Sequence, residues 1–496
     1  MAKTGFDNDK YLQMQSQKIA ERMSEFGGKL YLEFGGKLFD DFHASRVLPG
    51  FKPDSKITML STMKDMVEVV IVINAKDIAQ NKLRADIGIT YDEDVLRLYD
   101  VFQSKGLYVG SIVISQFSED NKAAVNFENK LKSNGIKVYH HYTIEGYPTD
   151  VAHVVSDEGL GKNDYVETSR KVVVVTAPGP GSGKMATCLS QVYHDAKRGY
   201  SSGYAKYETF PIWNLPLNHP VNIAYEAATA DLNDINMIDP WHMQAYGVST
   251  VNYNRDVEVF PVLNEIFTRV LGKSPYNSPT DMGVNMAGYA ICDDEVCCEA
   301  SKQEIIRRYL AAKVVERRNA SGSVMSDKIA RMMSSLGITV EDRQVVVAAR
   351  AFSEEKGVPA AALQLPNGKI VTGKTSALMG CCSAMLINAL KSLAKIDDET
   401  ELIAPIALEP IQTLKTKTLG DFTPELHTDE VLIALSVSAA LNPSAKKALQ
   451  ALPKLRGCQV HSTVIPPRAD EKIFRKLGVQ ATSDPVYSSK RVYFGN

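Results

Sequence analysis

The glycine-rich segment 178–184 contains the residues of this sequence that could most readily bind a phosphate group. It reads Pro-Gly-Pro-Gly-Ser-Gly-Lys and follows four consecutive valines at 172–175. Such a run predicts a strand that is buried on both faces, and residues 185–197 predict a helix. A glycine loop between a strand and a helix presents main-chain N–H groups to an anion. We therefore expect a phosphate-binding loop here.

The segment departs from the P-loop pattern G-x-x-x-x-G-K-[ST] at two positions. Pro178 stands where the first glycine is expected, and Met185 stands where a hydroxyl would bind magnesium. Because proline has no N–H, the expected phosphate donors are the amides of Gly179, Gly181, Ser182, Gly183 and Lys184. The Lys184 side chain is the expected catalytic cation, neutralising charge on the phosphoryl oxygens. The alternative is a tight turn whose glycines only allow close packing.

A second segment, residues 368–375, matches the P-loop pattern letter for letter as Gly-Lys-Ile-Val-Thr-Gly-Lys-Thr. The sequence Pro-Asn-Gly at 366–368 lies between two runs with strand character, 360–365 and 369–372. That arrangement predicts a β-hairpin. A hairpin lacks the helix N-terminus that the motif needs, so we do not expect this second match to bind phosphate.

A short stretch after the glycine pair at 35–36 holds other groups that could do chemistry. Asp40, His43 and Arg46 are spaced by three residues and follow Lys37. On a helix this spacing would place a carboxylate, an imidazole and a guanidinium on one face. The three residues are further catalytic candidates, placed to bind a second substrate. The alternative is a solvated, ion-paired surface.

Carboxylates also gather at Asp231 and Asp234. Near a bound phosphate they could hold a magnesium ion, because hard cations prefer oxygen ligands. Helix capping is the competing interpretation. Zinc is not expected, since the chain has neither the cysteine spacing of a zinc finger nor an H-E-x-x-H sequence.

The overall composition is that of a globular protein with a small-molecule ligand. The chain has 496 residues, of which 44% are hydrophobic and 23% are charged, and a formal net charge of -2. This charge gives no electrostatic reason to expect a nucleic-acid or membrane partner. We expect a phosphate-bearing small molecule and a homo-oligomer instead. No run is long enough to span a membrane and no signal peptide is recognised, so we expect a cytoplasmic protein.

The seven cysteines fit a reducing compartment, because an odd number with two adjacent pairs does not form a disulfide framework. Cys381 and Cys382 lie near the start of an expected helix at 376–393. A helix N-terminus would lower a thiol pKa and favour nucleophilic catalysis. The small, apolar residues around them favour a place in the core.

Strand and helix signals alternate from about residue 56 to 197. This alternation predicts a doubly wound, mostly parallel α/β sheet with helices on both faces, and ligands bind at the carboxyl ends of such strands. The expected strands are 57–60, 67–75, 108–115, 136–142 and 172–175, with helices at 92–104 and 121–133. We divide the chain into a P-loop-like α/β domain at 1–235, a mainly helical subdomain at 236–325 and a mixed α/β domain at 326–496. The last has expected strands at 344–349, 360–365, 369–372 and 459–465.

Several longer strings resemble a large bacterial family of uncharacterised proteins. They are residues 151–167, 176–189, 210–217, 227–232 and 252–256, and the resemblance covers essentially the whole chain. Some members of that family are labelled ATP-dependent zinc peptidases. The resemblance brings no established catalytic residues, so the candidates above come from the residue patterns alone.

Together these patterns favour a cytosolic enzyme that binds ATP, another nucleotide or a phosphometabolite and transfers or hydrolyses a phosphoryl group, with magnesium as the expected metal. Two other classes stay open. One is a metal-dependent hydrolase that uses histidine and aspartate side chains. The other is a non-catalytic homo-oligomeric assembly protein in which the glycine loops shape the contacts between subunits.

Overall fold

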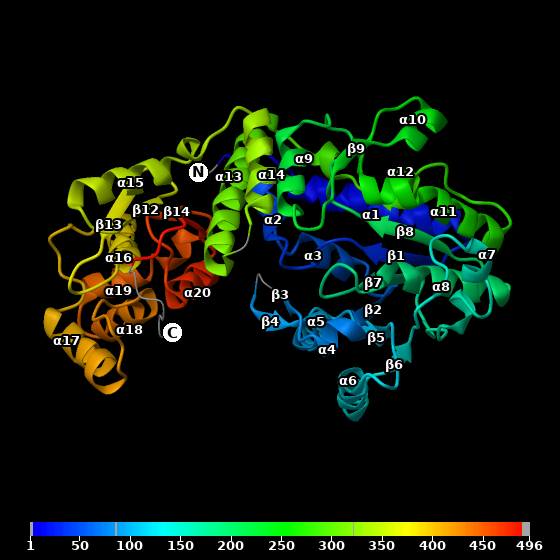
Figure 1. Cartoon of the computed structure of the whole chain (residues 1–496), viewed down its shortest axis with the longest axis horizontal. Helices are drawn as coiled ribbons and strands as arrows, with labels where there is room; N and C mark the ends of the chain where they lie inside the picture. Colours follow the sequence, from blue (N-terminus) through cyan, green and yellow to red (C-terminus); the bar gives the residue numbers. More distant parts are fainter. Residues whose placement is uncertain (1–2, 85–86, 321, 489–496) are drawn as a thin grey trace. The chain divides into compact units, whose positions relative to one another are not determined.

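The computed structural model describes residues 3–84, 87–320 and 322–488 and groups them into two compact units (Figure 1). The amino-terminal unit comprises Thr4–Glu226 and Asn233–Cys297, and the carboxy-terminal unit comprises Ala227–Leu232 and the chain from Cys298 onward. The division between the units thus falls inside the segment 236–325. The assignment of three domains stays a prediction.

The amino-terminal unit is built on a parallel sheet that has seven strands among the described residues. Its order is β11-β8-β1-β7-β2-β5-β6, and every neighbouring pair is parallel. The strands are β1 (Leu30–Phe34), β2 (Val67–Asn74), β5 (Tyr108–Ser115), β6 (Val138–His140), β7 (Val172–Thr176), β8 (Gly203–Tyr207) and β11 (Gly283–Val284). The predicted parallel α/β sheet is therefore confirmed.

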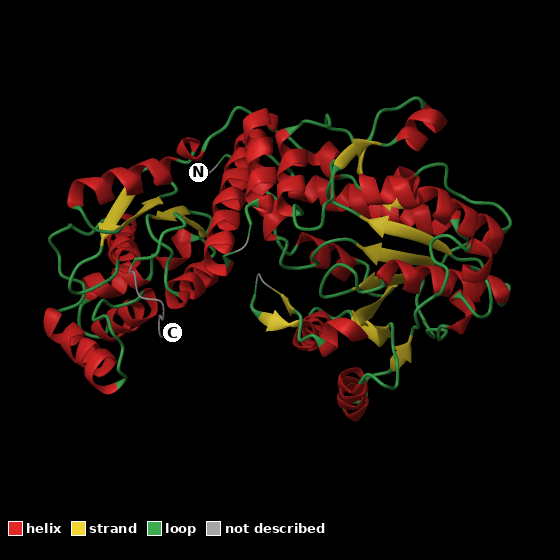
Figure 2. Cartoon of the chain, viewed as in Figure 1, coloured by secondary structure: helices red, strands yellow, loops and turns green. Residues whose placement is uncertain are grey.

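Helices cover both faces of this sheet (Figure 2). Helix α5 (Tyr91–Ser104) packs on β2 and β5, and α8 (Lys184–Lys197) packs on β1, β7 and β8. The β2-to-β5 and β7-to-β8 connections run across the sheet in opposite directions. Because parallel crossovers are right-handed, α5 and α8 lie on opposite faces. Burial from both sides explains why β1, β2 and β7 carry uninterrupted buried residues.

The remaining helices and strands of the amino-terminal unit are short, except for helices α1, α6 and α11. They are α1 (Asn8–Glu25), α2 (Phe42–Val47), α3 (Ser55–Thr62), β3 (Leu83–Arg84), β4 (Ile89–Thr90), α4 (Ala75–Ala79), α6 (Lys122–Ser133), α7 (Val151–Val154), α9 (Pro220–Ala228), β9 (Asn236–Ile238), α10 (Pro240–Tyr246), β10 (Val251–Tyr253), α11 (Asn254–Leu271) and α12 (Pro279–Met282). The predicted strand at 57–60 is wrong, because α3 occupies this segment.

The carboxy-terminal unit contains a smaller, mixed sheet in the order β13-β12-β14-β15. Its strands are β12 (Ala360–Gln364), β13 (Ile370–Lys374), β14 (Gln459–Ser462) and β15 (Gln480–Ser483). Pairs β12–β13 and β12–β14 are antiparallel, whereas β14–β15 is parallel. The predicted mixed sheet is confirmed, but the expected strand at 344–349 is part of a helix.

Eight α-helices are assigned in the described residues from 294 onward. They are α13 (Asp294–Asn319), α14 (Val324–Ser335), α15 (Gln344–Lys356), α16 (Cys381–Ala394), α17 (Pro405–Thr413), α18 (Thr428–Ser438), α19 (Pro443–Leu449) and α20 (Arg468–Leu477). The core of this unit joins α16 and α18 to the strands through buried aliphatic side chains. In the described part of the chain, no helix has both the length and the apolar character needed to cross a membrane.

Candidate functional site

The glycine loop at 177–183 lies where the direction of the sheet connections changes. Strand β7 lies between β1 and β2. The chain leaving β7 continues to β8 on one side, whereas the chain leaving β2 continues to β5 on the other. Ligands of open parallel sheets bind at such a divergence, beyond the carboxyl ends of the strands. The predicted strand–loop–helix order is confirmed, with β7 ending at Thr176 and α8 beginning at Lys184.

Side chains from neighbouring strands hold the carbonyl groups of this loop. Asn74 Nδ2 donates to the carbonyl oxygen of Gly181 at 3.3 Å, and Ser115 Oγ donates to that of Ser182 at 2.7 Å. Ser182 Oγ donates to the carbonyl oxygen of Gly179 at 2.8 Å. Asn74 and Ser115 are the last residues of β2 and β5. The edge of the sheet therefore holds the carbonyl oxygens of the loop rather than its main-chain N–H groups.

The main-chain N–H groups of the loop are not engaged in the same way. Among residues 3–84, 87–320 and 322–488, no group accepts a hydrogen bond from the N–H of Gly179, Gly181, Ser182 or Gly183. Gly179 and Gly183 are half-buried and Gly181 is exposed. Donors of this kind at the start of a long helix can bind an anion.

Two of the loop glycines also have a packing role. A Cβ atom on Gly179 would lie 2.7 Å from Cζ of Tyr91, and one on Gly183 would lie 2.9 Å from Cβ of Ser115. Gly183 has a φ angle of 93°, in the left-handed region that glycine adopts most readily. The close-packing interpretation of these glycines is therefore correct at two positions, and it is compatible with donation from their amides.

Lys184 begins α8 and is half-buried. Burial lowers the pKa of its ammonium group, and the charge of Glu33 opposes this shift. Glu33 also raises the pKa of Lys206. Glu33 on β1 is the register partner of both Val175 on β7 and Lys206 on β8. The loop follows β7, Glu33 lies on β1 and Lys206 lies on β8. These three strands are adjacent, so the three features lie at the same edge of the sheet.

A buried group of ionisable side chains surrounds Lys206, and we call Lys206, Glu208, Tyr253 and Asp256 the Lys206 cluster. Lys206 Nζ lies 2.9 Å from Glu208 Oε1 and also contacts Asp256 Oδ2 and Tyr253 Oη. Tyr253 Oη donates to Glu208 Oε1 at 2.9 Å. The cluster combines the end of β8, the end of β10 and the first turn of α11.

The Lys206 cluster contains one permanent cation and one carboxyl group that titrates near neutral pH. Burial raises the pKa of Glu208 to about 7, in spite of the neighbouring Lys206 ammonium. Burial lowers the pKa of Lys206, but the carboxylates of Asp256 and Glu208 outweigh it and raise that pKa well above its ordinary value. Perturbed groups gathered at one sheet edge are typical of catalytic sites, and a carboxyl pKa near 7 suits a general base.

The structure does not assemble the predicted face of Asp40, His43 and Arg46. Helix α2 begins at Phe42, with Asp41 as its N-cap, so Asp40 lies outside the helix. Asp40 Oδ2 is paired with Arg97 Nη1 at 3.0 Å. This ion pair agrees with the structural alternative for Asp40.

His43 and Arg46 do lie together on α2. The His43 ring packs against Phe210, with ring centroids 5.2 Å apart, and against Tyr225 at 6.2 Å. These aromatic contacts place His43 close to the chain that leaves β8. Its catalytic role stays a prediction.

Asp231 and Asp234 belong to different compact units. Asp234 is buried and its Oδ1 lies 2.7 Å from Arg255 Nε, whereas Asp231 is exposed and groups with the carboxy-terminal unit. Neither residue caps the start of α10, because Asp239 is its N-cap and accepts from the N–H of Trp241 and His242. A role in metal binding stays a prediction for both.

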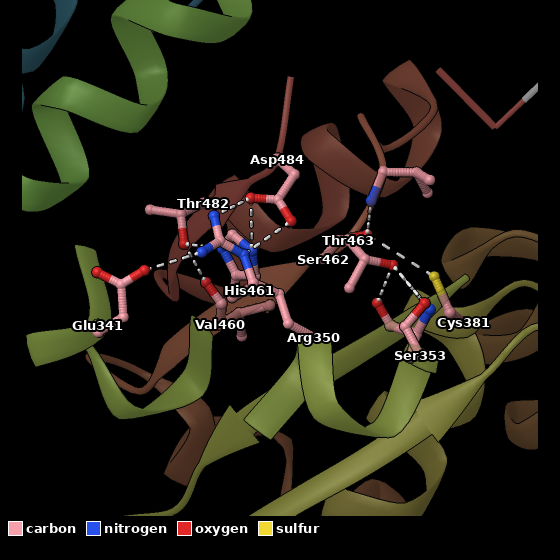
Figure 3. A network of polar contacts seen from close by, with 12 residues as sticks. Glu341, Arg350, Ser353, Cys381, Val460, His461, Ser462, Thr463, Thr482 and Asp484 are labelled. Carbon is pink, nitrogen blue, oxygen red and sulfur yellow. Dashed lines mark hydrogen bonds and ion pairs between the residues drawn. The ribbon is translucent and has the colours of Figure 1, made fainter. Parts of the chain in front are cut away.

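Cys381, one of the two cysteine candidates, belongs to a polar network in the carboxy-terminal unit (Figure 3). Cys381 is buried at the first position of α16, and its Sγ lies 3.7 Å from Ser462 Oγ. A hydrogen bond from Cys382 lowers the pKa of the Cys381 thiol. His461 precedes Ser462 on β14, so its ring projects from the opposite face of the strand, toward Asp484. The thiol and the imidazole therefore do not form a nucleophile–base pair.

The Lys206 cluster is the part of the site that the sequence patterns did not reveal. Its members come from two separated segments, and strand β8 was not predicted. A local signal was present, since Lys206 and Glu208 flank Tyr207 at the end of a short segment that is otherwise uncharged. Charged residues at the end of a buried strand mark either paired charges or a site.

Fold and site together define a parallel α/β protein with ionisable groups and open amides at the carboxyl edge of its sheet. The chain belongs to a family of unknown function: models described as "Domain of unknown function DUF1846, N-terminal" and "Domain of unknown function DUF1846, C-terminal" match residues 4–337 and 341–493.

Bacterial relatives carry the description UPF0371 protein and match over nearly the full chain. The relative from Corynebacterium efficiens is 60% identical over 491 residues, covering 99% of this chain and 99% of that protein. The relative from Corynebacterium diphtheriae is 60% identical over 489 residues, covering 99% and 98%. One from Streptococcus thermophilus is 57% identical over 493 residues, covering 99% and 100%. These names describe no activity.

Proposed function

We propose that this protein is a cytoplasmic enzyme that binds a nucleotide or a phosphometabolite at the loop 177–184 and transfers or hydrolyses its phosphoryl group. The observation that supports the proposal is the set of main-chain N–H groups at 179, 181, 182 and 183, which have no acceptor among the described residues and lie at the divergence of the sheet connections. An anionic ligand supplies the missing acceptors.

In this proposal the groups at the sheet edge divide the chemistry between them. The loop amides and Lys184 bind the phosphoryl oxygens and offset the negative charge that builds up there. Glu208 accepts the proton of the attacking water or hydroxyl as its oxygen forms the new bond to phosphorus. The bond from phosphorus to the leaving oxygen breaks, and that oxygen leaves with the electron pair. Lys206 keeps a positive charge beside Glu208 throughout.

Magnesium enters this proposal with the ligand. Met185 offers no hydroxyl, and Asp234 is already paired with Arg255. A magnesium ion would therefore be held mainly by phosphate oxygens, as hard cations on nucleotides commonly are.

Isothermal titration of ATP, ADP and orthophosphate tests the binding step. We expect Lys184→Ala to weaken binding by about tenfold or more, because one charge-assisted contact contributes roughly 1.5–3 kcal/mol. The matched control is Lys374→Ala, the lysine at the same place of the second P-loop match, which should bind like the wild type. Equal affinity of wild type and Lys184→Ala for every ligand would exclude the loop as the site.

A second variant tests the chemical step separately from binding. Glu208→Gln removes the proton acceptor but keeps the size of the side chain and one oxygen that accepts hydrogen bonds. We expect phosphate release from the bound ligand to fall by about 100-fold or more while affinity stays within about threefold. Unchanged turnover in Glu208→Gln would rule out this residue as the base and leave the binding proposal standing.

A further inference from the structure

Helix α18 of the carboxy-terminal unit carries a line of exposed apolar side chains. Ile433, Val437 and Leu441 follow at intervals of four residues and are 64%, 69% and 95% exposed. Side chains four apart lie on the same side of a helix. The helix ends at Ser438, and the N–H of Leu441 bonds back to the Ser438 carbonyl oxygen at 3.1 Å, which continues the line. We call these three residues the α18 stripe.

The opposite side of α18 is also apolar. Val431, Ala434 and Leu435 are buried and belong to the core of the unit. A helix that is apolar on both sides is usually covered on both sides in the native protein. Helix α17 packs beside α18, and Ile406 on it is 79% exposed. Leu414 and Leu419, which follow α17, are exposed as well.

The size of this surface argues for a protein partner. Together with Ile406, Leu414 and Leu419, the stripe makes six apolar side chains that are 51% to 95% exposed on and after two neighbouring helices. Apolar patches on monomeric proteins rarely exceed a few hundred Å². A stable interface of ordinary size needs about 800 Å² from each partner. The exposed apolar side chains on and after α17 and α18 are of the kind from which such an interface is built.

A stripe with large side chains at both ends and a smaller one in the middle can pair with a copy of itself about a two-fold axis. We propose that two copies associate through α18, which pairs antiparallel with α18 of the other copy about a two-fold axis at Val437. Under this symmetry each Ile433 lies opposite Leu441 of the partner subunit, so large side chains meet at both ends and the smaller Val437 meets its equivalent in the middle.

The charges beside the stripe support the same pairing. Asp429 lies one helical turn before Ile433, and Lys446 and Lys447 are exposed shortly after Leu441. Antiparallel pairing brings the acidic start of one stripe toward the basic end of the other in both halves of the contact. Parallel pairing would place like charges together, which is unfavourable at an interface.

Sedimentation velocity of the full chain tests the proposal. We expect the wild type to form a dimer or an even-numbered oligomer at about 10–100 µM, because even the weaker interfaces of ordinary size have dissociation constants on the order of 1 µM. Val437→Glu should weaken association by about 100-fold or more, because the axis places two carboxylates against each other. The matched control is Val324→Glu on α14, where Val324 is 80% exposed and outside the stripe. It should associate like the wild type.

A crosslinking experiment tests the geometry independently of affinity. In a Cys292→Ser background, which removes the exposed cysteine, Val437→Cys should form an intermolecular disulfide on mild oxidation, since an axis brings equivalent side chains together. Val324→Cys in the same background should not. A monomeric or trimeric wild type, or association of Val437→Glu equal to that of Val324→Glu, would overturn the proposal. Circular dichroism confirms that each variant is folded.

Discussion

Two segments of this chain resemble the P-loop sequence pattern, and the one that matches the pattern better has the less suitable structure. Residues 368–375 match the pattern fully but form the turn and second strand of a hairpin, in which Gly368 N–H donates to the Leu365 carbonyl oxygen at 2.9 Å. Residues 178–184 lack two of the pattern's residues but connect a buried parallel strand to a helix. The predicted hairpin is confirmed.

This difference shows that the surroundings of a glycine decide what it does. Gly373 of the full match lies against α16, where a Cβ atom would overlap the main chain of Met385. Gly183 of the partial match combines a positive φ with the side chain of Ser115 at close range. The first glycine serves helix packing, whereas the second also leaves a donor at a sheet edge. Four changes, described in order of decreasing effect, test this contrast.

Gly373→Val should have the largest effect on stability. The new side chain meets main-chain atoms of α16 that cannot move without shifting the helix, so we expect a loss of more than about 3 kcal/mol in the carboxy-terminal unit. Chemical denaturation followed by circular dichroism measures this loss. Phosphate titration of the folded protein should be unchanged, and a wild-type denaturation midpoint would contradict the packing role of Gly373.

Glu208→Gln should change how stability depends on pH. The pKa of Glu208 is about 7 in the folded protein and 4.5 as its ordinary value. Between these values the folded state binds more protons, so the free energy of unfolding falls as pH rises from 4.5 to 7 and is flat above. The glutamine variant does not titrate. Its stability relative to the wild type should therefore increase by roughly 2–3 kcal/mol between pH 4.5 and 8.

Urea denaturation at several pH values measures this relative change. The control is Asp484→Asn in the carboxy-terminal unit, where the pKa is shifted the other way. Hydrogen bonds from His461 and Arg350 overcome burial and lower the pKa of Asp484 to about 2. The contacts of Asp484 with His461 and Arg350 stabilise the fold above pH 3.8, and this stabilisation is lost as the pH falls toward 2. Parallel pH profiles for wild type and Glu208→Gln would show that Glu208 has an ordinary pKa.

Gly183→Ala should have a moderate effect of about 1–2 kcal/mol. A methyl group disfavours the left-handed conformation and meets Ser115, whose hydroxyl holds the Ser182 carbonyl oxygen. Displacing that contact should also weaken orthophosphate binding several-fold, as measured by titration calorimetry. Gly181→Ala is the matched comparison, because it has positive φ but open space around it. Equal losses in both variants would limit the cause to backbone conformation.

Thr375→Ala should have the smallest effect, about 1 kcal/mol or less. In the full match this residue occupies the position of the magnesium-binding hydroxyl, but its side chain forms a hydrogen bond with the Cys381 thiol and its N–H closes the hairpin against Pro359. Alanine keeps that N–H. A decrease of more than threefold in magnesium–ATP affinity would show that the hairpin takes part in binding after all.

The buried strands were the most predictable part of the fold. Residues 172–175 form a strand because four β-branched residues lie between two helical layers. The same reasoning is wrong for Val345–Val347, which lie in α15 among alanine, glutamate and lysine residues that favour a helix. It is also wrong for Ile57–Leu60, where the short run forms α3. A run of three or four apolar residues does not distinguish the two structures without its surroundings.

The candidate site was predictable only where its residues are neighbours in sequence. The loop at 178–184 is one segment, and its place between a strand and a helix was predicted correctly. The Lys206 cluster depends on the register of Glu33 with Lys206 and on the entry of α11, neither of which leaves a local pattern. The prediction that Asp40 shares a helix face with His43 and Arg46 is wrong for a local reason. Asp41 caps α2, so Asp40 lies before the helix.

The position of β1 between β7 and β8 has a consequence for the synthesis of this protein. Strand β1 is among the first elements to leave the ribosome, but both of its sheet neighbours, β7 and β8, are synthesised far later. Until then its two edges are unpaired, and such edges favour aggregation. Strand β1 therefore has both neighbours only after residue 207 has been synthesised. We expect chaperones to bind this part of the nascent chain during translation.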